Sequence, residues 1–174
     1  MQEDIQKVLN RMCDPKEEEA YHFADKLGGM ADEETKDHLI TLVKGTQWEI
    51  AYLACRALSK TAWNGESLDA IFEVIFEKKN KSVQGAFVQI LEEFNLAERF
   101  VDVFRVYLFG NFKASTLAKG YLDSVEFDIT PRTIRKAEKH WNHYLHNPED
   151  EESLALKKLE VEPMLQELKD LFEE

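Results

Sequence analysis

The chain has 174 residues, of which 44% are hydrophobic and 11% aromatic, so it can fold into one ordinary domain and is not a disordered segment. Its formal net charge is −12 at pH 7, with 11 acids against 5 bases in residues 1–40 and 10 acids against 3 bases in residues 147–174. A field of this sign repels phosphate backbones, which argues against nucleic acid as a partner and favours a protein with a basic surface.

The N-terminal segment MQEDIQKVLN is charged and lacks the apolar core of a signal peptide. No apolar run reaches the roughly 20 residues that a membrane span requires. Cys13 and Cys55 are too few for a disulfide scaffold, and both lie among helix-pattern residues. We therefore expect a cytoplasmic protein with two reduced thiols and no membrane partner.

Helical periodicity begins at the first residues of the chain. Apolar residues at positions 5, 8, 9 and 12 predict a first helix. Asp14 and Pro15 are typical of an N-cap and first helical position, so they predict the start of a second helix. This second helix is expected to stop at the pair Gly28-Gly29.

The next three segments also predict helices. Asp32 can cap a third helix that ends at Gly45, and a fourth runs from about Thr46 to about Trp63. A fifth follows the break at residues 64–65, with apolar side chains at positions 68, 71, 72, 75 and 76, and closes at residues 78–80. Nothing alternates with the period of two that a strand requires, so the predicted class is all-α.

Four segments resemble one another at a roughly constant spacing. AYHFADKLGG (20–29) and AYLACRALSK (51–60) start 31 residues apart, AFVQILEEFN (86–95) starts 35 residues later, and STLAKGYLDS (115–124) a further 29. Another apolar-periodic helix precedes each copy, so the repeating unit is a helix pair. Because one such pair cannot bury its own apolar face, neighbouring pairs are expected to stack.

EIAYLACRALSK (49–60) resembles the second helix of a HEAT-like repeat, with aliphatic Ile50, small Ala54, and Leu58 followed by Ser59. The resemblance covers residues 1–126 as four helix pairs and implies a short right-handed α-solenoid, with residues 127–174 as C-terminal capping helices. The family's aspartate and arginine, which form a ladder between repeats, are not in place, since Ala51 stands at the arginine position. An irregular helical bundle is the alternative.

TPRTIRKAEKHWNHYLHNP (130–148) predicts an amphipathic helix capped by Thr130, with Pro131 at its first position. Its buried stripe is expected to hold residues 134, 137, 141, 144 and 145. The opposite side carries a basic stripe formed by Arg132, Arg135, Lys136 and Lys139. We interpret this stripe either as a site for an anion or acidic partner, or as a solvated face that pairs with the chain's own acids, for example those at 149–152.

The histidines of the same helix, at positions 140, 143 and 146, fan across about 120° of its polar side. A zinc site requires convergent imidazoles and a further ligand, and nearby Lys136 and Lys139 repel a cation. Histidines near a helix C-terminus also interact favourably with its dipole. We therefore expect neither a metal nor any other cofactor.

The tail, residues 148–174, is expected to form two short helices divided at Pro163. The second carries an apolar seam at positions 164, 165, 168, 171 and 172. This seam is expected to cap the last repeat; the alternative is that it docks into a groove on another protein.

The sequence contains no phosphate loop, glycine fingerprint, nucleophile elbow or paired-cysteine metal motif, so we expect no enzyme. The leading hypothesis is a non-catalytic protein–protein interaction module (adaptor, scaffold or inhibitor) that binds through the concave face of its repeats. The candidate contact residues are Trp48, Glu49, Tyr52, Arg56, Gln84, Phe87, Val88, Lys113, Thr116 and Lys119.

Two alternatives remain. The first is an acidic inhibitor or immunity-type protein that shields a basic partner, and it depends on charge alone. The second is a nucleic-acid-binding protein of the kind of the HEAT-like DNA glycosylases, which use tryptophans with an aspartate and an arginine on a basic concave face. Trp48, Trp63 and Trp141 cannot be matched to those positions one by one, and the chain is acidic for such a role.

Overall fold

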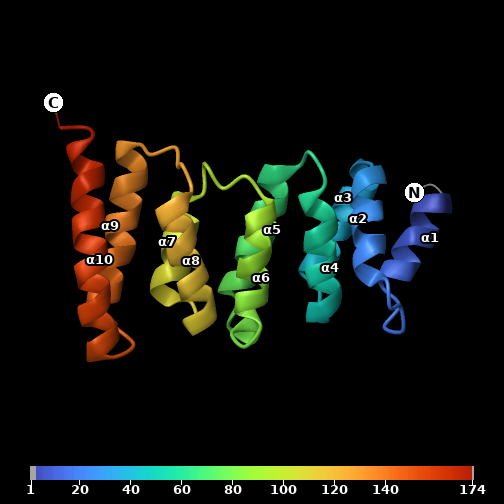
Figure 1. The fold of residues 1–174 in the computed structure, drawn as a ribbon, viewed down its shortest axis with the longest axis horizontal. Coiled ribbons are helices and arrows are strands. Elements are labelled where there is room, and N and C mark those ends of the chain that lie inside the picture. Colours follow the sequence, from blue (N-terminus) through green and yellow to red (C-terminus); the bar gives the residue numbers. More distant parts are fainter. Residues whose placement is uncertain (1–2, 174) are drawn as a thin grey trace. The chain divides into compact units, whose positions relative to one another are not determined.

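The computed structural model describes residues 3–173, and every regular element in that range is a helix (Figure 1). The predicted all-α class is therefore confirmed for this part of the chain. The chain divides into two compact units, residues 1–95 (unit 1) and residues 96–174 (unit 2). The domain boundary predicted after residue 126 lies inside unit 2.

Unit 1 contains six α-helices that follow one another in chain order in Figure 1. They are α1 (Glu3–Met12), α2 (Ala20–Met30), α3 (Glu33–Val43), α4 (Trp48–Ser59), α5 (Asn64–Phe76) and α6 (Gln84–Ile90), with short 3-10 helices at Lys78–Asn80 and Leu91–Glu93. Within this unit α1 packs on α2, α3 on α4, and α5 on α6. The helices α2, α4 and α6 also contact in succession, as do α3 and α5.

Side-chain pairs between successive helix pairs of unit 1 recur at sequence separations of 29 to 33 residues. They are Tyr21–Tyr52, Asp25–Arg56, Lys36–Glu66, Lys44–Glu73 and Lys60–Glu93. The separations match the spacing of about 31 residues between the sequence copies. Equivalent positions of consecutive helix pairs therefore lie side by side in this unit.

Unit 2 contains four helices: α7 (Phe100–Phe109), α8 (Phe112–Ser124), α9 (Pro131–His146) and α10 (Glu151–Asp170). Helix α7 packs against both α8 and α9, and α10 packs against α9. The side chains of Asn111, Thr130 and Asp150 cap α8, α9 and α10 by accepting a backbone N–H of the first turn. The stripe predicted for α9 is buried at Ile134 and at positions 137, 141 and 144, while position 145 is half-buried.

The start predicted for the second helix is wrong. Asp14 accepts a hydrogen bond from the backbone N–H of Lys16, and the Glu17 carboxylate accepts from Arg11 and from the Glu19 N–H. These local bonds hold residues 13–19 in turns, so α2 begins only at Ala20. At its other end α2 continues through Gly28-Gly29 to Met30, because the buried backbone of Gly28 packs closely against α4.

The division of the tail at Pro163 is also wrong, because α10 runs unbroken from Glu151 to Asp170. Contacts with the rest of unit 2 hold both halves of the helix. Before the proline, Glu160 accepts a hydrogen bond from the Tyr107 hydroxyl; beyond it, Lys169 forms a 2.5 Å ion pair with Glu138. Tertiary packing thus offsets the loss of the backbone hydrogen bond that proline cannot donate.

Across residues 3–173, none of the helices combines the length and apolar character needed to cross a lipid bilayer.

Candidate functional site

The most prominent exposed aromatic surface of unit 1 lies on α2 and α4, and we name it the α2–α4 face. It consists of Tyr21, Asp25, Trp48, Tyr52 and Arg56. The three residues from α4 are four positions apart and therefore follow one side of the helix. Trp48 is 41% exposed and Tyr21 is 54% exposed, values that stand out for large apolar side chains.

A bidentate ion pair organises this face. Arg56 Nε and Nη2 each donate to a carboxylate oxygen of Asp25 at 2.8 Å, so the guanidinium bridges α4 and α2. This guanidinium lies 5.2 Å from the centroid of the Tyr21 ring. The hydrogen bonds from Arg56 hold the pKa of the Asp25 carboxyl below its usual range, so the pair is ionised at neutral pH.

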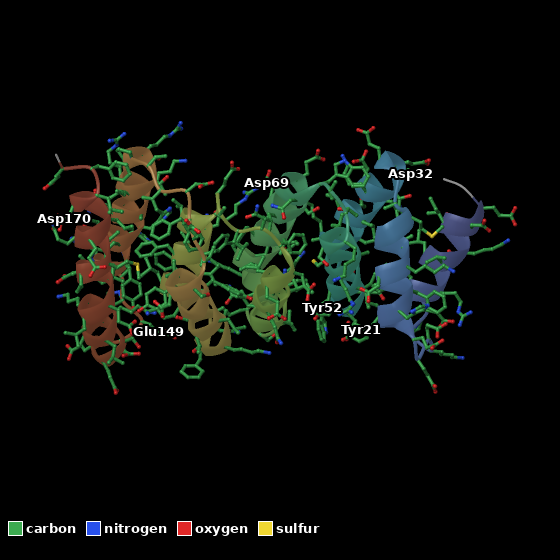
Figure 2. The ribbon with its side chains drawn as sticks, turned by 45° about the horizontal axis from the view of Figure 1, so that its top comes forward. Tyr21, Asp32, Tyr52, Asp69, Glu149 and Asp170 are labelled. Atoms are coloured by element: carbon green, nitrogen blue, oxygen red, sulfur yellow. The ribbon has the colours of Figure 1, made fainter. Side chains whose placement is uncertain are left out.

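The two tyrosines of the face lie against each other. Their ring centroids are 6.1 Å apart with an interplanar angle of 75°, an edge-to-face contact between α2 and α4. Figure 2 shows both side chains projecting from these neighbouring helices. Tyr52 is the more enclosed of the two, and burial raises the pKa of its hydroxyl. The exposed ring of Tyr21 is therefore supported on one side by Tyr52 and on another by Arg56.

Sequence reasoning identified the α4 side of this face and missed the α2 side. Trp48, Tyr52 and Arg56 are all exposed or half-buried, as predicted, and Glu49 beside them is exposed. Asp25 was missed because the expected ladder arginine was sought at the Ala51 position, whereas Arg56 makes the contact between successive helix pairs. The useful signal was the shared 31-residue separation of the Tyr21–Tyr52 and Asp25–Arg56 pairs.

The prediction that three residues of α6 are exposed contact residues is wrong. Gln84, Phe87 and Val88 are at most 4% exposed, because this short helix is buried against both α4 and α5. Gln84 donates from its side chain to the Ile75 carbonyl at 2.7 Å, which satisfies a buried amide. These side chains belong to the core of unit 1.

The remaining predicted contact residues belong to α8 of unit 2. Lys113 and Thr116 are exposed, and the Thr116 hydroxyl donates to the Phe112 carbonyl within the helix. Lys119 is half-buried and forms a 2.6 Å ion pair with Asp123. These residues belong to unit 2, whereas the α2–α4 face belongs to unit 1.

Unit 2 contains a basic groove of about 620 Å³ between the start of α7 and the first half of α9. We define the basic groove by its ionisable lining: Glu98, Arg99, Asp102 and Arg105 on the α7 side, and Arg132, Lys136 and His140 on the α9 side. The predicted basic stripe therefore divides in two. Arg132 and Lys136 line the groove, whereas Arg135 and Lys139 lie on the same helix outside the groove.

Ion pairs occur on the α7 side of the groove. Asp102 lies between Arg99 and Arg105, with N–O distances of 3.6 and 3.7 Å. By contrast, no carboxylate of residues 3–173 lies within 4.0 Å of the Arg132 guanidinium or the Lys136 ammonium. Pairing of these two groups with the acids at 149–152 is therefore wrong for the described residues, whereas the alternative of a solvated basic face agrees with their exposure.

The three late histidines lie in separate environments. His140 lines the basic groove, where burial first and the charge of Arg105 second lower its pKa. The His143 ring lies 5.8 Å from the Phe109 ring, and His146 Nδ1 lies 2.7 Å from the Asn142 carbonyl oxygen. Among residues 3–173, no cluster of three or more histidine, cysteine or acidic side chains is arranged to hold a metal ion.

The half-buried Lys157 joins the tail to α7 and α8 of its own unit. Lys157 Nζ donates to the Tyr107 carbonyl at 2.7 Å and to Ser115 Oγ at 3.1 Å, and stands 3.9 Å from the centroid of the Tyr107 ring. Burial lowers the pKa of this ammonium to about 8. The predicted seam is buried at Leu165 but largely exposed at positions 171 and 172, so α10 packs on unit 2 mainly through its middle.

The remaining tryptophans and the thiols belong to packed surroundings. The Trp63 ring lies 5.7 Å from the Lys36 ammonium, and Trp141 is 6% exposed and stacked on Tyr144. Burial raises the pKa of both the Cys13 and Cys55 thiols, which keeps them protonated at neutral pH.

No family model matches the chain, and neither a curated protein nor a solved structure matches it.

Proposed function

We propose that this protein is a non-catalytic protein–protein interaction module, an adaptor, scaffold or inhibitor, and that the α2–α4 face is its contact surface. The exposed Tyr21 and Trp48, together with an ordered arginine that lies over the Tyr21 ring, carry this proposal. Tyrosine, tryptophan and arginine dominate the binding energy of protein interfaces.

The face is ordered before any partner arrives. The Asp25–Arg56 pair and the tyrosine contact fix the aromatic rings, so binding costs less side-chain entropy than it would with mobile side chains. The two helices that carry the face are equivalent members of successive helix pairs. This arrangement supports a short HEAT-like solenoid, in which such helices line one surface.

The expected partner has a basic surface. The net charge of −12 attracts such a partner at long range and raises its association rate, an effect that salt screens. The same attraction fits an acidic inhibitor that covers a basic protein. The free cysteines suit a reducing compartment such as the cytoplasm.

The test compares wild-type protein with the double variant Tyr21→Ala/Trp48→Ala as bait in extracts of the native cell. We expect the recovered amount of at least one captured protein to be about tenfold or more lower with the variant than with the wild type, because two hot-spot residues are lost. Mass spectrometry with labelled extracts measures the ratio, and circular dichroism verifies that the variant stays folded.

The matched control is Leu156→Ala/Leu159→Ala, which removes exposed apolar side chains from α10 and leaves the α2–α4 face intact. Partners retained equally by all three baits would show that the face does not bind protein. Tight binding of duplex DNA at low salt would instead favour the glycosylase-like alternative.

A further inference from the structure

We propose that the basic groove of unit 2 is a second binding site, and that it takes the dianionic phosphoryl group of a phosphorylated segment of a partner protein. This site is independent of the α2–α4 face, which belongs to unit 1.

The charge of the groove matches one phosphoryl group. Its lining holds four permanent cations (Arg99, Arg105, Arg132 and Lys136) against two carboxylates (Glu98 and Asp102), so two positive charges remain. A phosphorylated side chain carries about −1.5 to −2 at pH 7 and presents three strong acceptor oxygens. The concentration of positive charge contrasts with the acidic character of the whole chain, whose net charge is −12.

The groove also carries donor groups of the kind that phosphate binds. Arginine presents a planar fork of donors that binds two phosphate oxygens at once. On the α7 side, Asp102 holds Arg99 and Arg105 at 3.6 and 3.7 Å, which keeps both guanidinium groups in the groove. On the α9 side, the exposed Arg132 and Lys136 have no carboxylate of the described residues within 4.0 Å. An incoming anion therefore displaces no ion pair at these two groups.

The surroundings favour a single phosphoryl group over a long polyanion. Unit 2 contains 16 acidic and 11 basic residues, so an extended nucleic-acid backbone meets repulsion beyond the groove. The groove volume of about 620 Å³ accommodates one phosphorylated side chain together with its neighbouring backbone. A phosphorylated peptide segment satisfies both conditions.

The experiment titrates the full chain with a fluorescein-labelled pentapeptide, Gly-Ala-phosphoserine-Ala-Gly, and with its unphosphorylated counterpart, in fluorescence polarisation at about 50 mM salt. We expect the phosphorylated peptide to bind at least tenfold more tightly. We also expect Arg132→Gln/Lys136→Gln to weaken its binding at least tenfold, because both lost charges line the groove.

Arg135→Gln/Lys139→Gln is the matched control, since it removes the same charge from the same helix outside the groove. We expect this control to change the affinity less than twofold. Neither double variant breaks an ion pair among the described residues, so both should keep the wild-type Tm.

Three outcomes would overturn the proposal. Equal affinity for the two peptides would show that the phosphoryl group is not recognised. Equal losses in the two double variants would indicate diffuse attraction to α9 in place of a groove. Stronger competition by duplex DNA than by unlabelled phosphopeptide would assign the groove to nucleic acid. The Tyr21→Ala/Trp48→Ala variant should bind the peptide with wild-type affinity. A negative result for the groove therefore says nothing against the proposal that the α2–α4 face binds protein.

Discussion

Arg56 combines two roles on one side chain, because it joins successive helix pairs and also supports an exposed aromatic ring. Its two 2.8 Å bonds to Asp25 fix α4 against α2, and its guanidinium lies over Tyr21. Both partners of the ion pair are only partly exposed, which limits screening by solvent. Stability and binding surface therefore depend on the same contact.

We expect Asp25→Asn to lower the free energy of unfolding by about 1 kcal/mol at pH 7, the usual contribution of a partly exposed bidentate pair. Because the folded-state pKa of Asp25 lies below its unfolded value, this stabilisation is present above the unfolded pKa of about 3.9 and is lost as pH falls through the folded pKa. Urea unfolding of wild type and variant at pH 7 and near pH 3 measures the difference.

The control is Glu49→Gln, which removes an exposed carboxylate of α4 that has no ion pair among the described residues. Its stability should stay within about 0.5 kcal/mol of the wild type. A double-mutant cycle with Arg56→Gln isolates the coupling. A coupling energy near zero at pH 7 would show that the ion pair does not stabilise the fold.

At the scale of the element, the sequence predicted most helices because their signals are local. Asp32 caps α3 by accepting the Thr35 N–H, and Thr130 caps α9 by accepting the Thr133 N–H, as their positions indicated. The amphipathic stripe of α9 is buried at four of its five predicted positions because a helical period fixes which side chains share a face.

Apart from the start of α2, which local turns delay, the errors concern contacts between elements, which local patterns do not encode. Pro163 predicted a break, but packing of α10 on both sides of it keeps the helix whole. The sequence predicted Arg132 and Lys136 of the basic groove, because these two residues share a helix face. It did not predict Arg99 and Arg105, which lie on the α7 side. No spacing along the chain indicates that α7 lies against α9.

Close packing of α2 on α4 is the basis of an element-scale prediction. A Cβ added at Gly28 would lie 2.2 Å from the Ala57 carbonyl oxygen and 2.8 Å from Lys60 Cβ, both on α4 or its C-terminal end. We expect Gly28→Ala to destabilise unit 1 by about 2 kcal/mol, because overpacking against backbone outweighs the helix propensity that alanine adds. Thermal and urea unfolding measure this loss.

Gly29→Ala is the internal control, since a Cβ at that position meets no atom within 4 Å. Alanine is favoured over glycine in a helix interior by about 1 kcal/mol, so this variant should be at least as stable as the wild type. Equal effects of the two substitutions would show that α2 and α4 do not approach closely at Gly28.

At the scale of the whole molecule, packing in each unit joins helices that are close in sequence. Every principal helix contact connects elements one or two positions apart in chain order, such as α1 with α2, α2 with α4, and α7 with α9. The ion pairs and hydrogen bonds named above between successive helix pairs of unit 1 span 29 to 33 residues. Closing such short loops costs little chain entropy.

This local connectivity predicts fast folding. Helical proteins with mainly local contacts refold in microseconds to milliseconds, so we expect the main phase of this chain to finish within about 10 ms at 25 °C. Stopped-flow fluorescence after dilution from urea measures the rate, with Trp48 and Trp63 as reporters in unit 1 and buried Trp141 in unit 2. Single-tryptophan variants, with phenylalanine at the other two positions, assign each signal to its unit. A dominant phase of seconds that prolyl isomerase does not accelerate would contradict the prediction, because it would require contacts between distant parts of the chain to form first.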